Sequence, residues 1–127
     1  MSQPDNRPLS PHLQIYDLPV TAKLSVLHRG TGAALTGGLI LLVLALAFAA
    51  SGADSWATMH GLLSSWFGYL VLFGFTAALY YHFCNGIRHL MWDMGKGMEL
   101  DQLDKSATFV LAATGVLTCL TWVIALL

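Results

Sequence analysis

The sequence predicts an all-α membrane protein with three transmembrane helices. Of its 127 residues, 56% are hydrophobic and 10% are charged, and the mean hydropathy is +0.64, whereas a soluble domain carries roughly 25% charged residues. Residues 30–53, 55–87 and 106–127 contain no Asp, Glu, Lys or Arg. Each of these stretches exceeds the roughly 20 residues that a helix needs to cross a bilayer. The composition therefore excludes a soluble globular domain.

The first 24 residues are expected to form a cytoplasmic arm that precedes a three-helix transmembrane domain at residues 25–127. Three of the four prolines lie before position 12, and proline disrupts both helix interiors and sheet ladders, so the arm should begin as an extended segment. Asp17 and Pro19 are typical helix-start residues. The first transmembrane span is predicted at about residues 28–52, with entry into the membrane near Ser25.

The second charge-free run is longer than one span needs. A loop of small and polar residues is expected at 51–54, and residues 55–65 are interpreted as an interfacial loop that contains His60. The second transmembrane span is then predicted at about residues 66–90.

A charged stretch joins the second span to the third. Gly95 and Gly97 lie in this stretch and are expected to break the helix. The third span is predicted at residues 106–127, directly after the last charged residue.

The basic residues predict the orientation of the chain in the membrane. All six fall on one side of the predicted spans, and the loop between the first and second spans has none. Because cytoplasmic segments are enriched in Lys and Arg, the N-terminus should be cytoplasmic and the C-terminus periplasmic. The first helix is expected to serve as its own targeting signal. The formal net charge of −1 gives no indication of nucleic-acid binding. The basic residues are Arg7, Lys23, Arg29, Arg88, Lys96 and Lys105.

Small residues in the first span predict a partner helix. Glycine or alanine recurs at four-residue spacing, which lets another backbone approach closely. The pairs are Gly30 with Ala34, Ala33 with Gly37, and Ala34 with Gly38.

The two cysteines, Cys84 and Cys119, lie inside predicted spans and form neither a C-x-x-C nor a C-x-x-C-H motif. The chain therefore has neither a disulfide framework nor a covalent c-type haem motif. Both are interpreted as small buried residues.

A histidine in the second span is the main candidate for chemistry. At 100° per residue His82, Asn85, Gly86 and His89 share one stripe. An imidazole at membrane depth needs a partner for its nitrogens. His82 could ligate the iron of a haem, with Gly86 leaving room for the macrocycle, or it could hydrogen-bond to a neighbouring helix. His28, His60 and His89 are expected near the membrane surfaces rather than opposite His82, so any second axial ligand should come from another subunit.

A second constellation lies at the cytoplasmic end of the first span. Ser25, His28 and Arg29 are three or four residues apart and therefore share one helix face. They could donate hydrogen bonds to a quinone carbonyl, and Arg29 could pair with a haem propionate. Alternatively, Ser25 caps the helix and Arg29 only anchors the topology.

Other polar and aromatic residues suggest simpler roles. Trp92, Tyr16 and Trp56 are interpreted as aromatic residues of the membrane interface, and Asp93 as a partner of a nearby basic group such as Arg88. Position 12, a histidine in the arm, could contact a soluble partner.

Three segments, "RPLSPHLQIY", "SVLHRGTG" and "HFCNGIRHLMWDMGKG", closely resemble the large cytochrome b anchor subunits of succinate dehydrogenase, respiratory complex II. The resemblance covers nearly the whole chain, and the three separated motifs occur in the order of the family. It implies three spans with an inside N-terminus, packed against a second, small anchor subunit.

The resemblance also implies site residues. His82 falls on the axial histidine of haem b, and the second axial ligand is implied to come from the small anchor subunit. Ser25 and Arg29 fall on the quinone-site serine and arginine, and His28 falls on a histidine near a haem propionate. His89, Asp93 and Trp92 match the motif without an assigned role, and Gly86 is a further candidate residue of the site.

The function that the resemblance implies is electron transfer to ubiquinone. A flavoprotein subunit with FAD and an iron-sulfur subunit with its clusters oxidise succinate and pass electrons to ubiquinone, which this anchor helps to hold. Haem b as an electron reservoir and haem b as a structural group are both compatible with the sequence. The sequence is most similar to mitochondrial and alphaproteobacterial members of the family. The chain begins only six residues before Arg7 and shows no Arg-rich transit peptide. This start favours a bacterial inner membrane.

Two other functions compete with this one. A purely structural anchor would dock soluble subunits without binding haem or quinone. A small proton-coupled transporter is disfavoured, because the three spans contain no Asp or Glu and such carriers usually place a carboxylate in the membrane.

Overall fold

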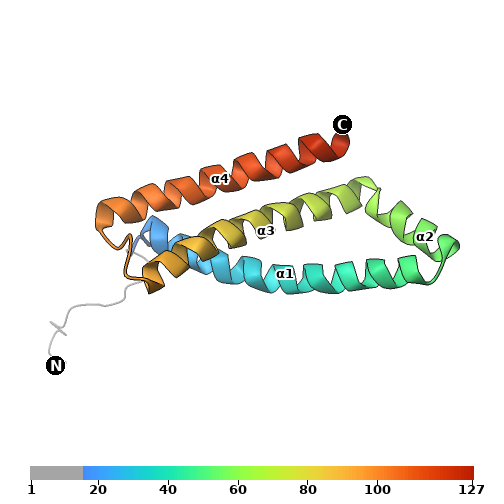
Figure 1. The fold of residues 1–127 in the computed structure, drawn as a ribbon, viewed down its shortest axis with the longest axis horizontal. Coiled ribbons are helices and arrows are strands. Elements are labelled where there is room, and N and C mark those ends of the chain that lie inside the picture. Colours follow the sequence, from blue (N-terminus) through green and yellow to red (C-terminus); the bar gives the residue numbers. More distant parts are fainter. Residues whose placement is uncertain (1–15) are drawn as a thin grey trace, which may run out of the picture.

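A computed structural model describes residues 16–127 as four helices (Figure 1). These are α1 (Val20–Ala50), α2 (Ala53–Leu63), α3 (Trp66–Asp93) and α4 (Leu100–Leu126). Helices α1, α3 and α4 are long and apolar enough to cross a membrane, and the described residues contain no strand. The predicted all-α membrane fold with three spanning helices is thus confirmed.

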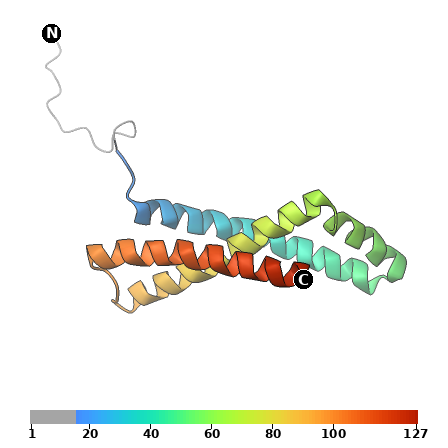
Figure 2. The same ribbon diagram turned by 90° about the horizontal axis from the view of Figure 1, so that it is seen from above.

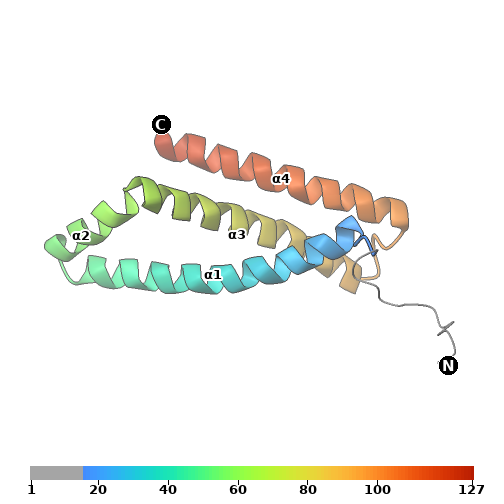
Figure 3. The same cartoon turned by 180° about the vertical axis from the view of Figure 1, so that it is seen from behind.

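The three long helices form an open bundle in which α3 contacts both α1 and α4. The start of α1, the end of α3 and the start of α4 lie at the same end of the bundle, and α2 joins α1 to α3 at the opposite end (Figures 2 and 3). Most large apolar side chains point outward, as expected where the surroundings are lipid.

Helix α1 begins where the sequence predicts. The carbonyl of Pro19 accepts hydrogen bonds from the amides of Ala22 (2.9 Å) and Lys23 (3.1 Å), so the helix is established from Val20. Ser25 lies inside the helix, and the alternative that Ser25 caps it is therefore wrong. The segment that is predicted to be extended, with its three prolines, Arg7 and His12, lies outside the described residues.

Residues 55–65 do not form the predicted loop, because most of them belong to α2. Gly52 has a φ of 116°, a conformation open mainly to glycine, and it reverses the chain after α1. Trp56, Met59 and Leu63 follow helical spacing, and Met59 is buried. The loop is predicted because the charge-free run is longer than one span, but the excess residues form a short helix instead.

The turn from α2 into α3 is tight. The hydroxyl of Ser65 accepts a hydrogen bond from the amide of Gly68 at 3.0 Å, which caps α3. A Cβ atom at Gly68 would collide with the carbonyl groups of Leu62 and Leu63. Glycine is therefore required at this position.

The turn between α3 and α4 confirms the predicted helix break. Gly95 and Gly97 have φ values of 71° and 77°, and the indole of Trp92 donates a hydrogen bond to the carbonyl of Gly97 at 3.1 Å. Helix α4 begins at Leu100, six residues before the predicted third span.

A small apolar core joins the three long helices toward the end of the bundle that is opposite α2. It consists of Leu24, Tyr81, Ala107 and Val110, with Cys84 packed against it. Both cysteines are free, but Cys119 is exposed rather than buried, which corrects the prediction for that residue. The position of Cys119 on the outward face of α4 explains the difference.

The small residues of α1 divide between two directions. A Cβ atom at Gly38 would lie 2.9 Å from ring carbons of Phe75, so Gly38 serves a contact with α3 in the same chain. Gly30 and Gly37 have no atom within 4 Å of such a Cβ. The outward glycines are thus free of contacts within the described residues.

Candidate functional site

His82 of α3 faces α1, and its protonation is fixed by a backbone carbonyl. Its Nδ1 lies 3.1 Å from the carbonyl oxygen of His28 and 3.3 Å from the hydroxyl of Thr31. A carbonyl only accepts hydrogen bonds, so this partner assigns the proton to Nδ1. The lone pair of Nε2 is therefore free, and this is the form in which a neutral imidazole binds a metal.

Glycine in α1 makes room for the ring of His82. A Cβ atom at Gly32 would lie 3.1 Å from Cε1 and 3.6 Å from Nδ1 of His82. A Cβ at Gly86 would make only an ordinary contact, 3.8 Å from Cε1 of His28. The contact with His82 thus favours glycine at position 32, while the role of Gly86 beside a macrocycle stays a prediction.

His28 lies against His82 at the same level of the bundle, whereas the sequence predicted the two residues to lie apart. The two rings are stacked, with centroids 4.0 Å apart and planes inclined by 8°. Helix α1 begins at Val20, so His28 is about two turns inside the helix. The position of His28 relative to the membrane surface stays a prediction.

His89 also belongs to this group, and its predicted position near a membrane surface stays a prediction. Its ring centroid lies 5.0 Å from that of His28 and 4.9 Å from that of Trp92, to which it is nearly perpendicular. His28, His82 and His89 are hereafter called the histidine cluster. His60 lies apart from it, on α2 beside Trp56 and Ser64.

The histidine cluster is not a metal centre by itself. No group of three or more His, Cys, Asp or Glu side chains between residues 16 and 127 is arranged to hold a metal ion.

Arg88 is buried, and the prediction that it pairs with Asp93 is wrong. It is 4% exposed, and it donates to the hydroxyl of Ser106 at 2.8 Å and to the carbonyl of Leu103 at 3.0 Å. Its guanidinium carbon also lies 4.2 Å from the ring centroid of Trp92. Arg88 points toward α4, whereas Asp93 is exposed at the end of α3.

Ser25 and Arg29 share one face of α1, as predicted. The Nε of Arg29 donates to the carbonyl oxygen of Ser25 at 3.4 Å. Arg29 is exposed and Ser25 is half-buried. The side chains are therefore adjacent and accessible at the same end of the bundle as the histidine cluster.

Several residues of the site escaped the prediction. Thr31 and Gly32 contact His82, and the hydroxyl of Tyr81 donates to the carbonyl of Leu24 at 2.7 Å. The four-residue spacing of Gly32 from His28 places Gly32 on the same face of α1, and this spacing could have identified it as a residue of the site.

The three aromatic residues that were assigned to the membrane interface differ in exposure. Tyr16 and Trp56 are exposed, whereas Trp92 is half-buried under Arg88.

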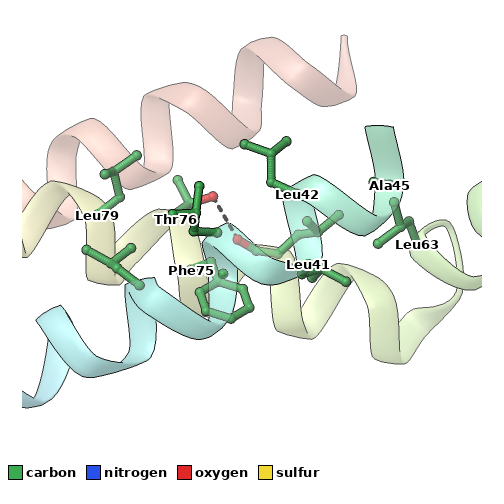
Figure 4. Close-up of a pocket in the computed structure, with 11 residues that line it drawn as sticks. Leu41, Leu42, Ala45, Leu63, Phe75, Thr76 and Leu79 are labelled. Carbon is green, nitrogen blue, oxygen red and sulfur yellow. Dashed lines mark hydrogen bonds between the residues drawn. The ribbon is translucent and has the colours of Figure 1, made fainter. Parts of the chain in front are cut away.

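An apolar pocket of about 450 Å³ lies farther along the bundle, between α1, α2 and α3 (Figure 4). Leu42, Leu63 and Phe75 contribute to its wall. Its only hydroxyl, on Thr76, donates to the carbonyl of Leu72 at 2.8 Å. The pocket therefore offers no free hydrogen-bond donor, and the candidate site remains the histidine cluster with the Ser25–Arg29 pair.

Comparison with known proteins gives a consistent result. The family model of the succinate dehydrogenase/fumarate reductase transmembrane subunit matches residues 3–121. The chain is 41% identical over 119 residues to the succinate dehydrogenase cytochrome b556 subunit of Paracoccus denitrificans, covering 94% of this chain and 92% of that one. It is 34% identical over 126 residues to the corresponding subunit of Rickettsia felis, covering 94% and 93%.

A mitochondrial relative is similar over a shorter part of its length. The chain is 40% identical over 111 residues to the succinate dehydrogenase cytochrome b560 subunit of Sus scrofa, covering 86% of this chain and 66% of that one. All three relatives are named as subunits of succinate dehydrogenase. With this match over nearly its whole length and with three spanning helices, the chain belongs to the family of succinate dehydrogenase/fumarate reductase transmembrane subunits.

Proposed function

We propose that this chain is the cytochrome b membrane anchor of a succinate:ubiquinone oxidoreductase. His82 is an axial ligand of haem b, and Ser25 and Arg29 contribute to the ubiquinone reduction site. The observation that carries the proposal is the hydrogen bond from Nδ1 of His82 to the carbonyl of His28, because it leaves the Nε2 lone pair free for iron.

The residues around His82 fit a haem group. The relatives are named cytochrome b subunits, and Gly32 admits the His82 ring close to the backbone of α1. The Nδ1 of His28 is buried without a hydrogen-bond partner among the described residues, which is costly for a polar group. A propionate carboxylate would accept a hydrogen bond from a protonated Nδ1. Haem b, when bound, supplies an iron that accepts and releases one electron.

The second axial ligand comes from a partner subunit in this proposal. Lone pairs of imidazole nitrogens lie in the ring plane, so the stacked rings of His28 and His82 cannot approach one iron from opposite sides. The outward glycines of α1, Gly30 and Gly37, support close approach of a helix from the small anchor subunit.

The Ser25–Arg29 pair supplies donors to the quinone. The guanidinium of Arg29 is held one helical turn from Ser25, and it carries a permanent positive charge. Donors fixed at the quinone oxygen stabilise the negative charge that develops when the ring is reduced. This chain therefore binds and orients the quinone, while succinate oxidation takes place on other subunits.

The proposed partners are the flavoprotein subunit with FAD, the iron-sulfur subunit and the small anchor subunit. The subunits would assemble in a bacterial inner membrane, as the similarity to a Paracoccus denitrificans protein supports. In that setting the N-terminus would be cytoplasmic and the C-terminus periplasmic, according to the distribution of basic residues.

The test is a reduced-minus-oxidised optical spectrum of the purified complex. His82→Ala should abolish or strongly alter the b-type bands, whereas His60→Ala, on α2 and outside the histidine cluster, should leave them unchanged. An unaltered spectrum in His82→Ala would contradict the ligand assignment. A native complex with the expected subunits and no b-type spectrum would instead favour a purely structural anchor.

A further inference from the structure

Arg88 is a buried cation, and its hydrogen-bond partners must all be acceptors. Besides its bonds to Ser106 and Leu103, its Nη1 lies 3.5 Å from Oδ1 of Asn85. The hydroxyl of Ser106 donates its own proton to the carbonyl of Leu103 at 2.9 Å, so it presents a lone pair to Arg88. A guanidinium has five donors and no acceptor, and a buried charge is costly unless these donors are used.

The orientation of the Asn85 amide follows from Arg88. Asn85 is 0% exposed, so both ends of its amide need partners within the protein. With Oδ1 turned toward Arg88, Nδ2 lies 3.3 Å from Nε2 of His89. The opposite orientation would set the amide protons of Asn85 against the donors of Arg88 and leave both unsatisfied.

The amide of Asn85 in turn decides the tautomer of His89. Because Nδ2 is only a donor, Nε2 of His89 must accept with its lone pair, and the proton of a neutral His89 lies on Nδ1. His82 has the same tautomer through a backbone carbonyl. The difference between them is the lone pair of Nε2, which is free in His82 and occupied in His89.

We propose that Arg88 and Asn85 are positioning residues that lock His89 as the Nδ1–H tautomer. The network makes His89 a hydrogen-bond donor beside His28 and withholds its Nε2 from a metal. Two histidines seven residues apart on one helix thereby take different roles, and only His82 remains competent as a ligand. The recipient of the His89 hydrogen bond rests on the proposed function, but the tautomer does not.

The experiment is solid-state ¹⁵N NMR of the complex with ¹⁵N-labelled histidine, in the reduced state, where a low-spin ferrous haem is diamagnetic. The signals of His89 are identified by their loss in His89→Gln. In the wild type, Nε2 of His89 should appear as an unprotonated nitrogen and Nδ1 as a protonated one. Once the signals are assigned in this way, a protonated Nε2 of His89 in the wild type would overturn the proposal, whatever the other variants show.

Two matched variants separate the network from general structure. Asn85→Asp replaces the donor amide by a second acceptor oxygen and keeps the partner of Arg88, so Nε2 of His89 should become protonated. Ser106→Ala removes a different contact of Arg88 and should leave the tautomer unchanged. An unprotonated Nε2 in Asn85→Asp would contradict the proposal.

The tautomer of His89 is tested independently of the assignment of His82 as a haem ligand. If His82→Ala kept its b-type spectrum while His89 showed the expected tautomer, the proposed function would fail and the network would stand. If the b-type spectrum depended on His82 while His89 carried its proton on Nε2, the network alone would be wrong.

Discussion

The imidazole rings of His28 and His82 stack face to face across the contact between α1 and α3, with centroids 4.0 Å apart. Gly32, one turn beyond His28, removes the side chain that would otherwise press on His82. The stack keeps the two rings on the same side of any group bound at Nε2 of His82. The stack therefore supports the proposal that the second axial ligand comes from a partner subunit.

The first prediction concerns the isolated subunit. Purified alone in detergent, the chain should bind haem weakly and without six-coordination, because the second ligand is proposed to lie on a partner. Optical titration with haem, compared with the spectrum of the intact complex, measures this. Stoichiometric six-coordinate haem in the isolated chain would contradict a site shared between subunits.

The second prediction concerns quinone reduction. Ser25→Ala and Arg29→Leu each remove a donor from the proposed site, and a hydrogen bond to a charged group contributes about 1.5–3 kcal/mol. Loss of one such bond in the transition state should slow ubiquinone reduction about 10- to 100-fold. Succinate oxidation with a soluble artificial acceptor should be unchanged.

Two variants serve as controls for the quinone prediction. Lys23→Leu removes an exposed cation that pairs with Asp17 at 3.0 Å, and Ser51→Ala removes a hydroxyl at the far end of α1. Both should keep normal quinone reduction. If Ser25→Ala or Arg29→Leu lost succinate oxidation with the soluble acceptor as much as ubiquinone reduction, the variant would have a structural defect, and the quinone role would be contradicted.

The spans and the main ligand candidate could be predicted from the sequence because both depend on local pattern. Charge-free runs identify membrane helices, and the angular spacing of α3 places His82, Asn85 and His89 on one face. The contact between His28 and His82 could not be predicted in the same way. Angular spacing shows which residues of one helix share a face, but it does not show how far α1 is displaced along α3, and this displacement brings the two rings together.

Long-range partners also escaped the sequence. Asp93 is close to Arg88 along the chain, and opposite charges suggest a pair, yet Arg88 bonds to Ser106 and Leu103 across the turn into α4. In the interior of a helical bundle, carbonyl and hydroxyl groups of a neighbouring helix can satisfy a guanidinium without a carboxylate. Sequence spacing gives no measure of such contacts between helices.

The third prediction concerns the contact between α1 and α3. Tyr81 is 4% exposed, and its hydroxyl bonds to the carbonyl of Leu24 at 2.7 Å, so Tyr81→Phe should lower the free energy of unfolding by about 0.5–1.5 kcal/mol. Tyr69→Phe alters a tyrosine that is 45% exposed and should have little effect. Unfolding of the complex by a denaturing detergent measures both. Equal losses of stability in Tyr81→Phe and Tyr69→Phe would show that the hydrogen bond from Tyr81 to Leu24 does not stabilise the contact between α1 and α3.

The fourth prediction tests the space around His82. In Gly32→Ala the new Cβ would lie 3.1 Å from Cε1 of His82, which is closer than ordinary van der Waals contact, and Gly32→Val would add two further methyl groups. The ring or α1 must shift, so haem content should fall and the b-type bands should move, more in the valine variant. Gly74→Ala, where a Cβ has no atom within 4 Å, should keep normal bands. Because α1 and α3 are joined at this level by the His82 to His28 hydrogen bond, unchanged spectra in both Gly32 variants would mean that this contact does not position the ligand.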